Sequence, residues 1–277
     1  MNGFYVFGGG MGHLARVRKF IDYKKIENFK VFTGNNAAYH FFDSQEIVFF
    51  EVKSKDLRMD LRQYHLRNSK KHSFKNFYVD CFPGGILNEL SPELFHTDHL
   101  FYLARHIRNE SYDFNNVSLK YDRCFQFEEL SIDQNKFCTE HTIKASQIDL
   151  PVILPDIART NDLKKKYPTP IWLIVHSSNI DEIALLVLIA KRTAERENKT
   201  PQLILLTDQD YRDNDLITIN NEWRSVDYFP IAEKIFSGAG FNTVMELKPY
   251  AEKHVCIPFE RKYDDQNRRM KKIGISS

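Results

Sequence analysis

The sequence has little cysteine, no long apolar run and almost no net charge. Its four cysteines are scattered over 277 residues and form no Cys-x-x-Cys pair, so neither a disulfide framework nor a zinc knuckle is indicated. No apolar stretch approaches the roughly 20 residues of a membrane-spanning helix. A formal net charge of +2 is too small to indicate nucleic-acid binding through bulk electrostatics. The chain starts directly with an apolar strand, so we expect no signal peptide and a cytoplasmic protein.

Apolar residues are sufficient for real cores, since they make up 42% of the 277 residues. Short apolar runs alternate with helix-like segments, which predicts an α/β fold with parallel sheets. Strands are expected over 4–7, 29–34, 47–52, 77–82, 99–104, 123–127, 171–175, 202–207 and 255–259, and helices over 13–23, 54–75, 181–198 and 264–273. A linker rich in Pro, Asp and Lys over 151–170 predicts two Rossmann-like domains facing a cleft, 1–155 and 156–277. The last helix is expected to pack back across the join.

A glycine-rich loop follows the first expected strand. Gly10 and Gly12 belong to a tight turn, His13 comes directly after it, and Arg16 lies one helical turn further on. Glycines allow close approach to a ligand, and the amides at the start of a helix favour a phosphate. His13 suits proton abstraction near neutral pH, donation to a phosphate, or a plain capping role. Arg16 suits a phosphate oxygen or the protein surface.

A second strand–turn–helix unit lies near the C-terminus. The turn consists of Ser237, Gly238, Ala239 and Gly240, and Asn242, Thr243 and Glu246 follow on the expected helix. Backbone amides from Ser237 to Asn242, together with the hydroxyls of Ser237 and Thr243, are suited to a diphosphate. The alternatives are glycines that serve only packing and a glutamate that only complements the helix dipole.

The stretch 226–273 resembles the donor-binding half of GT-B glycosyltransferases. It is most similar to family 28, which contains the N-acetylglucosaminyltransferase of peptidoglycan synthesis. The matching residues are Ser237 to Gly240, Thr243, Glu246, Ile257-Pro258-Phe259 and Asp265-Gln266-Asn267. The loop from Gly10 to Arg16 resembles the Gly-x-Gly-His-x-x-Arg loop of the same superfamily, and Asp80 to Gly85 with Glu89-Leu90 resembles a strand-end motif of its predicted members.

The resemblance implies a hexosyltransferase that moves a sugar from a nucleoside diphosphate, with UDP the leading candidate, to an acceptor hydroxyl. It implies no metal and no cofactor, His13 as the base, and Glu246 at the ribose hydroxyls. Asp265 and Gln266 would contact the sugar hydroxyls, or else form a solvated helix start. The acceptor is expected to be a lipid-linked or anionic glycan beside the basic stretch 54–75, with peripheral membrane association; no nucleic-acid partner is expected.

Three alternatives remain open at this point. A compact nucleotide-sugar hydrolase of pseudaminic acid synthesis uses a similar Gly-His-x-x-Arg loop, with water in place of the acceptor. A noncatalytic binding protein on the same scaffold would look alike, and His176 to Asn179 stand where many relatives carry a Gly-Gly-Ser turn. Asp208 and Asp210 have the spacing of a metal-binding Asp-x-Asp, but charged loops often contain such pairs.

Overall fold

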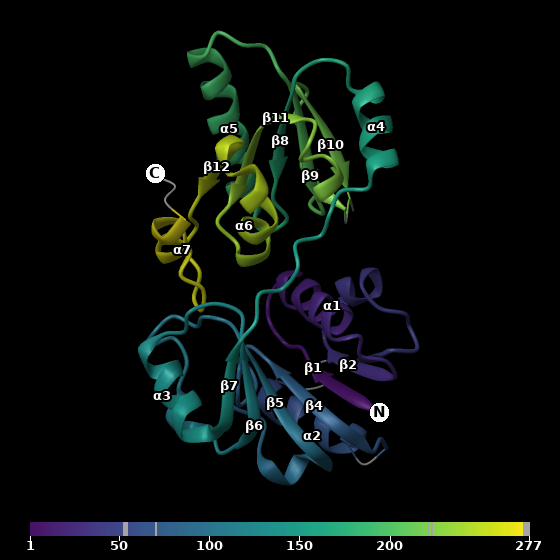
Figure 1. Cartoon of the computed structure of the whole chain (residues 1–277), viewed down its shortest axis with the longest axis vertical. Coiled ribbons are helices and arrows are strands. Elements are labelled where there is room, and N and C mark those ends of the chain that lie inside the picture. The colour runs from purple at the N-terminus through teal and green to yellow at the C-terminus, as the bar shows by residue number, and fades with distance from the viewer. Residues whose placement is uncertain (52–54, 70, 221, 223, 274–277) are drawn as a thin grey trace. The chain divides into compact units, whose positions relative to one another are not determined.

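The computed structural model of the chain describes residues 1–51, 55–69, 71–220, 222 and 224–273. The chain divides into two compact units, each built on one parallel sheet (Figure 1). Unit 1 contains Met1–Pro151 and Lys262–Asp265, and unit 2 contains Val152–Arg261 and the segment from Gln266 onward. Within the described residues, no helix is long and apolar enough to cross a membrane.

Unit 1 carries a sheet with the strand order β3-β2-β1-β4-β5-β6-β7, in which all paired strands run parallel. Its strands are β1 (Asn2–Tyr5), β2 (Phe29–Thr33), β3 (Ile47–Phe49), β4 (Phe74–Asp80), β5 (Thr97–Ala104), β6 (Tyr121–Gln126) and β7 (Thr142–Gln147). Its α-helices are α1 (Gly12–Lys24), α2 (Leu57–Ser69) and α3 (Ile132–His141), and short 3₁₀ helices span Asn36–His40, Pro92–Leu94 and Phe114–Asn116.

Alternate residues of the unit 1 strands point to opposite faces of the sheet, and each face has its own cover. On β4, the ring of Tyr78 contacts Phe20 of α1, with the ring centroids 5.6 Å apart. The next residue toward the N-terminus, Phe77, contacts His65 of α2 on the other face at 5.4 Å. Phe137 of α3 packs in the same core as Phe77. Helix α1 therefore covers one face, and α2 and α3 cover the other.

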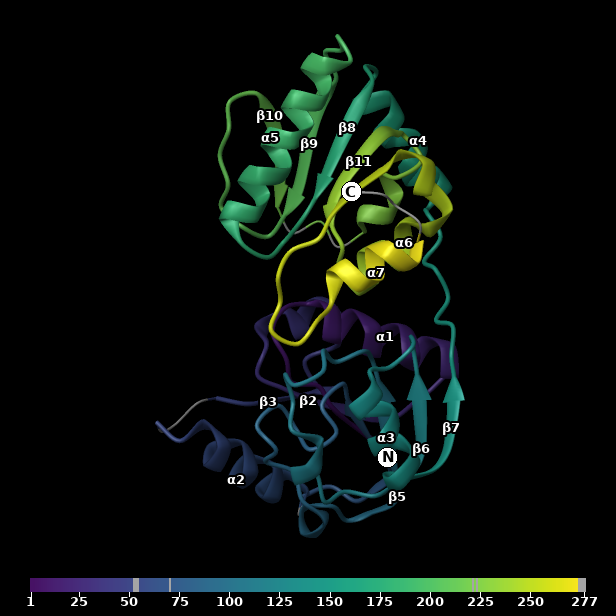
Figure 2. The same ribbon diagram turned by 90° about the vertical axis from the view of Figure 1, so that its left-hand side faces the viewer.

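Unit 2 carries a second parallel sheet with the strand order β10-β9-β8-β11-β12. Its strands are β8 (Ile171–Val175), β9 (Gln202–Thr207), β10 (Leu216–Asn220), β11 (Ala232–Gly238) and β12 (His254–Ile257). Its α-helices are α4 (Ile157–Lys166), α5 (Ile180–Arg196), α6 (Phe241–Leu247) and α7 (Gln266–Ile273), with 3₁₀ helices at Ser225–Asp227 and Lys248–Lys253. Figure 2 shows α5 and α4 on opposite faces of this sheet.

The faces of the second sheet again follow from alternation along one strand. Leu173 of β8 packs with Leu163 of α4, whereas Trp172 and Ile174 pack with Leu186 of α5. The buried residues of α5 recur at helical spacing, so the helix has an apolar stripe along one side. The prediction of an α/β fold with parallel sheets is confirmed.

Several predicted boundaries are wrong. The expected helix 54–75 ends at Ser69, and the chain from Phe74 already belongs to β4. Part of the expected linker is α4, whose N-cap Asp156 accepts a hydrogen bond from the Arg159 amide at 3.0 Å. The edge strands β7 and β10 were not expected. Residues 52, 54 and 70, which the sequence places in a strand and a helix, lie outside the described residues.

His65 of α2 is fully buried among aromatic rings. Its centroid lies 4.9 Å from that of Phe95 and 5.5 Å from that of Tyr5, and neither of its ring nitrogens has a hydrogen-bond partner. Burial lowers the pKa of His65 to about 3. The native imidazole is therefore neutral at physiological pH, with two polar atoms left unsatisfied in the core.

Replacing His65 with leucine is expected to stabilise the protein by about 1–3 kcal/mol at pH 7, because the unsatisfied polar atoms are removed. Between pH 6.5 and about 3 the unfolded chain binds a proton at His65 and the native protein does not, so the stability of the wild type falls as the pH falls. The gain in the variant should therefore grow from pH 7 to pH 5, as measured by urea unfolding. His96→Leu, at an exposed position, is the control. A pH-independent gain would contradict this account of His65.

Candidate functional site

A buried pair joins the first helix of unit 1 to the end of a neighbouring strand. His13 lies in the first turn of α1, and Asp80 is the last residue of β4, which pairs with β1. His13 Nδ1 and Asp80 Oδ2 are 2.6 Å apart, and the two residues are 9% and 2% exposed. The carboxyl ends of adjacent parallel strands meet at one edge of a sheet, so the glycine loop after β1 brings His13 to Asp80.

Arg16 holds the same carboxylate from one turn further along α1. Its Nη2 donates to both Asp80 oxygens at 2.8 and 2.7 Å, and its Nε donates to Oδ1 at 3.1 Å. The Arg16 side chain is fully buried, and its Nη1 has no hydrogen-bond partner. The sequence predicts Arg16 at a ligand phosphate or on the surface. The structure instead places its guanidinium against Asp80, where it balances the charge of the buried carboxylate.

The protonation of this cluster follows from its surroundings. Burial alone would raise the pKa of Asp80, but the charge of Arg16 and the hydrogen bonds from His13 and Arg16 bring it below the ordinary value. Burial lowers the pKa of His13, and this exceeds the opposing effect of Asp80. Asp80 is therefore a carboxylate and His13 a neutral imidazole that donates its Nδ1–H to Asp80. This tautomer leaves the lone pair on Nε2.

The Nε2 side of the His13 ring lies against the glycine loop. A Cβ built on Gly8 would lie 2.4 Å from Nε2, whereas one built on Gly9 would meet nothing within 4 Å. Among the described residues, Nε2 has no hydrogen-bond partner. Gly10 is exposed and has a φ of 84°, a conformation that favours glycine, and Gly12 begins α1. The loop thus packs a glycine against the imidazole and leaves Nε2 available as a proton acceptor.

The second glycine turn lies at the end of β11 in unit 2. Ser237 is the penultimate residue of β11, and its buried hydroxyl lies 2.8 Å from His254 Nε2. The Ala239 amide donates to the Ile257 carbonyl at 3.0 Å. The Ser237 hydroxyl and the Ala239 amide are therefore engaged inside the unit, unlike the diphosphate donors that the sequence predicts. Gly238 is packed against His176, since a Cβ on Gly238 would lie 2.9 Å from Cε1 of that ring.

Gly240 is the N-cap of α6, and its side of the turn is open. Its φ of −64° and ψ of 145° suit any residue, and a Cβ there would have only the Thr243 hydroxyl, at 3.9 Å, within 4 Å. The N-cap makes no side-chain cap hydrogen bond to the first amides of the helix. Asn242, Thr243 and Glu246 are all partly exposed on α6. Four of the predicted nucleotide contacts thus gather at this short helix: Gly240, Asn242, Thr243 and Glu246.

The predicted sugar-binding pair is divided between the units. Asp265 belongs to unit 1 and Gln266 to unit 2. Gln266 is buried, and its Oε1 accepts a hydrogen bond from the Phe259 amide at 2.9 Å. The carbonyl end of Gln266 therefore fixes the chain after β12, a role that the motif alone does not reveal.

A further network follows the end of β8, where the sequence departs from the Gly-Gly-Ser turn. His176 Nε2 lies 2.7 Å from Glu182, and Arg261 donates to both oxygens of the same carboxylate at 2.5 Å. Arg261 also contacts the Ser178 hydroxyl at 3.2 Å. Burial lowers the pKa of His176 despite Glu182. A charged and hydrogen-bonded cluster therefore occupies the position of the glycine turn.

Reasoning from sequence missed two functional candidates, Asp80 and the His176 cluster. Asp80 belongs to a motif that the sequence does single out. An ionisable residue near the carboxyl end of the expected strand 77–82 was an available signal, because such ends line ligand sites in parallel sheets. His176 likewise comes directly after β8. What the sequence cannot supply is the pairing of strands that brings each residue to its partner.

Comparisons with known proteins identify the fold. No protein-family model and no curated sequence matches the chain. The glycotransferase of kitacinnamycin has a TM-score of 0.59 at 11% identity, covering 99% of this chain and 84% of that one. A UDP-N-acetylglucosamine 2-epimerase from Rickettsia bellii has a TM-score of 0.57 at 12% identity, covering 98% and 82%. A UGT transferase from Siraitia grosvenorii in complex with UDP has a TM-score of 0.55 at 11% identity, covering 99% and 83%.

These similarities establish the GT-B type of fold predicted from the sequence. Identities of 11 and 12% show the fold alone. Since both glycosyltransferases and epimerases share it, the function must be argued from the residues of the two units.

Proposed function

We propose that this chain is a nucleotide-sugar enzyme that transfers a sugar from a nucleoside diphosphate, with UDP the leading candidate, to an acceptor hydroxyl. The observation that carries the proposal is the buried Asp80–His13 pair, whose available Nε2 faces the glycine loop of unit 1. A neutral, oriented imidazole is the group that deprotonation of a hydroxyl requires near neutral pH. The fold and a neighbour in complex with UDP support the choice of donor.

In the proposed reaction, His13 Nε2 takes the proton of the acceptor hydroxyl as that oxygen bonds to the anomeric carbon of the sugar. The bond between this carbon and the phosphate oxygen breaks, and the nucleoside diphosphate leaves with the electron pair. Asp80 stabilises the imidazolium that forms, and Arg16 keeps Asp80 ionised. The residues of α1 and β4 thus supply the base and its orientation.

We assign nucleotide binding to unit 2, around the start of α6. The amides after Gly240 would contact the diphosphate with Thr243, and Glu246 would accept the ribose hydroxyls, as in the family 28 enzymes that the motif resembles. Gly238 stays a proposed nucleotide contact, and its lack of a side chain makes room for the His176 ring. Asp265 stays a proposed contact of the donor sugar.

Calorimetry with UDP, GDP, CMP and dTDP tests the nucleotide assignment. Gly240→Val should abolish UDP binding, because the valine side chain would occupy the open space beside the amides that are proposed to hold the diphosphate. The protein should stay folded, because the position is sterically open and its φ and ψ suit valine. Lys248→Ala, at an exposed residue just after α6, is the matched control and should bind like the wild type. If the wild type binds none of these nucleotides at millimolar concentration, a noncatalytic binding protein is the better description.

The products separate transfer from its alternatives. Transfer releases the nucleoside diphosphate only with an acceptor, whereas a hydrolase releases it fully on water alone. An epimerase would change the sugar of the donor while the nucleotide remains attached. Release without any acceptor, at the same rate as with one, would count against transfer.

The glycine loop offers a matched pair of variants. Gly8→Ala should lower turnover about 10²-fold, because its methyl group would overlap His13 Nε2 and displace the base by about an ångström. Gly9→Ala should leave turnover nearly unchanged, since a Cβ there meets nothing within 4 Å. Initial rates of nucleoside diphosphate release measure both. Equal losses in the two variants would show that loop flexibility, and not the position of His13, controls the rate.

A further inference from the structure

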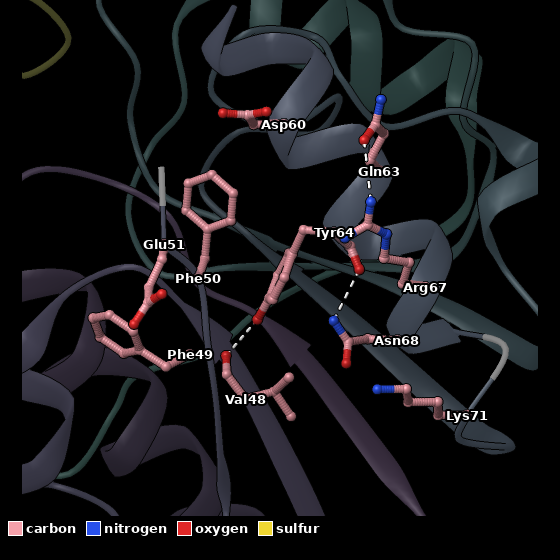
Figure 3. Close-up of a pocket in the computed structure, with 10 residues that line it drawn as sticks. All are labelled: Val48, Phe49, Phe50, Glu51, Asp60, Gln63, Tyr64, Arg67, Asn68 and Lys71. Atoms are coloured by element: carbon pink, nitrogen blue, oxygen red, sulfur yellow. Dashed lines mark hydrogen bonds between the residues drawn. The ribbon is translucent and has the colours of Figure 1, made fainter. Parts of the chain in front are cut away.

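Unit 1 contains a pocket of about 410 Å³ between the end of β3 and the exposed side of α2. Figure 3 shows its lining, which comes from the segment after β3 on one side and from successive turns of α2 on the other. This volume falls within the range of small-molecule sites, which combine apolar walls with a few convergent polar groups. The described lining has this composition, and none of its residues belongs to the His13 cluster.

The wall of the pocket is aromatic and fixed. Phe50 is buried, and its ring centroid lies 5.1 Å from that of Tyr64 on α2. The Tyr64 hydroxyl donates to the Val48 carbonyl, so the tyrosine offers its ring to a ligand and its hydroxyl to β3. The Phe49 ring points the other way and stacks on Tyr39, with the ring centroids 6.2 Å apart. The Tyr64 ring provides a flat apolar surface for the C–H face of a cyclic ligand.

Two cations on the α2 side lack a counter-charge. Arg67 and Lys71 are four residues apart, and both are exposed at the pocket. Within the described residues neither forms an ion pair, and the Arg67 guanidinium has only a 3.4 Å contact with Gln63. By contrast, Arg62 of the same helix, outside the pocket, is paired with Glu93. Two unpaired cations beside a partly enclosed apolar wall favour an anionic group on the ligand.

The remaining polar groups favour hydroxyls. The remaining polar side chains of the lining are the carboxylates Glu51 and Asp60 and the amides Gln63 and Asn68 of α2. Figure 3 shows Glu51 turned toward the Phe49 ring and away from Tyr64, which leaves the two amides beside the cations. Amides both donate and accept hydrogen bonds, which matches the capacity of sugar hydroxyls to do both. The Asn68 amide already donates to the Tyr64 carbonyl at 2.9 Å, so its oxygen is the end available to a ligand.

We propose that this pocket binds a sugar ring that carries an anionic group, a carboxylate or a phosphate. The ring packs against Tyr64, the anion contacts Arg67 and Lys71, and hydroxyls bond to the side-chain amides of Gln63 and Asn68. The binding site stands on these contacts alone, whereas its role as the place of the acceptor rests on the proposed function. The acceptor is then an acidic sugar.

The binding test uses the full chain and ligand-observed NMR titration with glucuronic acid, glucose 6-phosphate and glucose. At least one of the two anions should bind about tenfold more tightly than neutral glucose, because charge-assisted hydrogen bonds are lost with the anion. A preference for glucuronic acid identifies a carboxylate ligand, and one for glucose 6-phosphate a phosphate. Equal affinity for glucose and both anions would overturn the proposal.

Paired variants locate the binding. Arg67→Ala combined with Lys71→Ala should weaken binding of the preferred anion tenfold or more and leave that of glucose unchanged. Arg58→Ala combined with Arg62→Ala removes the same charge from the same helix outside the pocket and should bind like the wild type. Wild-type affinity in the Arg67/Lys71 variant would refute the pocket as the site. UDP calorimetry on the same proteins keeps the proposals apart, because a failure of UDP binding counts against the transferase and not against the pocket.

Discussion

His13→Ala is expected to lower turnover by about 10²–10⁴-fold while UDP affinity stays unchanged. The variant loses the base that takes the acceptor proton, and general-base catalysis contributes a factor of this size. The proposed nucleotide contacts lie in the other unit, so binding should not change with turnover. Single-turnover rates with a saturating donor, together with calorimetry, measure the two effects separately.

The pH profile gives this prediction a second readout. Since burial lowers the pKa of His13, the imidazole should stay a competent base below pH 6.5, and the acid limb of the rate should lie under that value. The limb should disappear in His13→Ala. His96→Ala, at an exposed histidine of the same unit, is the control and should keep both the rate and the profile. A His13 variant with near-wild-type turnover would remove the residue from the chemistry.

The central strands could be predicted because they are buried on both faces. Ile171–Val175 and Gln202–Thr207 read as short uninterrupted apolar runs, and the structure places β8 and β9 at these residues. The edge strand β7 has no such signal, since most of Thr142–Gln147 is exposed on a sheet margin. Helix α4 was hidden by composition, because three lysines and a nearby proline are typical of a linker.

The candidate site, like the fold, could be predicted from the sequence only in part. His13 could be picked out from its place after a glycine loop, because that local order alone sets it near the end of β1. The burial of Arg16 could not, since it depends on Asp80, 64 residues away in sequence, and on the pairing of β1 with β4. Likewise, nothing in the sequence near Ser237 indicates that its hydroxyl forms a hydrogen bond with His254. Chemistry that depends on a partner across the sheet requires the fold.

Asp80→Leu is expected to destabilise the protein by about 3–5 kcal/mol, because it leaves the Arg16 guanidinium buried without a counter-charge. The Arg16 side chain is 0% exposed and already has one nitrogen without a partner, so no solvent is at hand to replace the carboxylate. Urea unfolding at pH 7 measures the loss. Asp22→Leu is the matched control: this aspartate pairs with Arg18 on the same helix, both side chains are exposed, and the change should cost less than about 1 kcal/mol.

A second substitution separates the charge from the packing. Arg16→Met combined with Asp80→Leu should recover most of the stability that Asp80→Leu loses, because buried ion pairs replaced on both sides by apolar groups are often neutral in stability. Turnover should remain low in the double variant, since His13 has lost the carboxylate that orients its ring. If the double variant is no more stable than Asp80→Leu, the loss comes from misfitting of the leucine at the end of β4 and not from the stranded charge. If its turnover is normal, Asp80 serves the fold and not the orientation of His13.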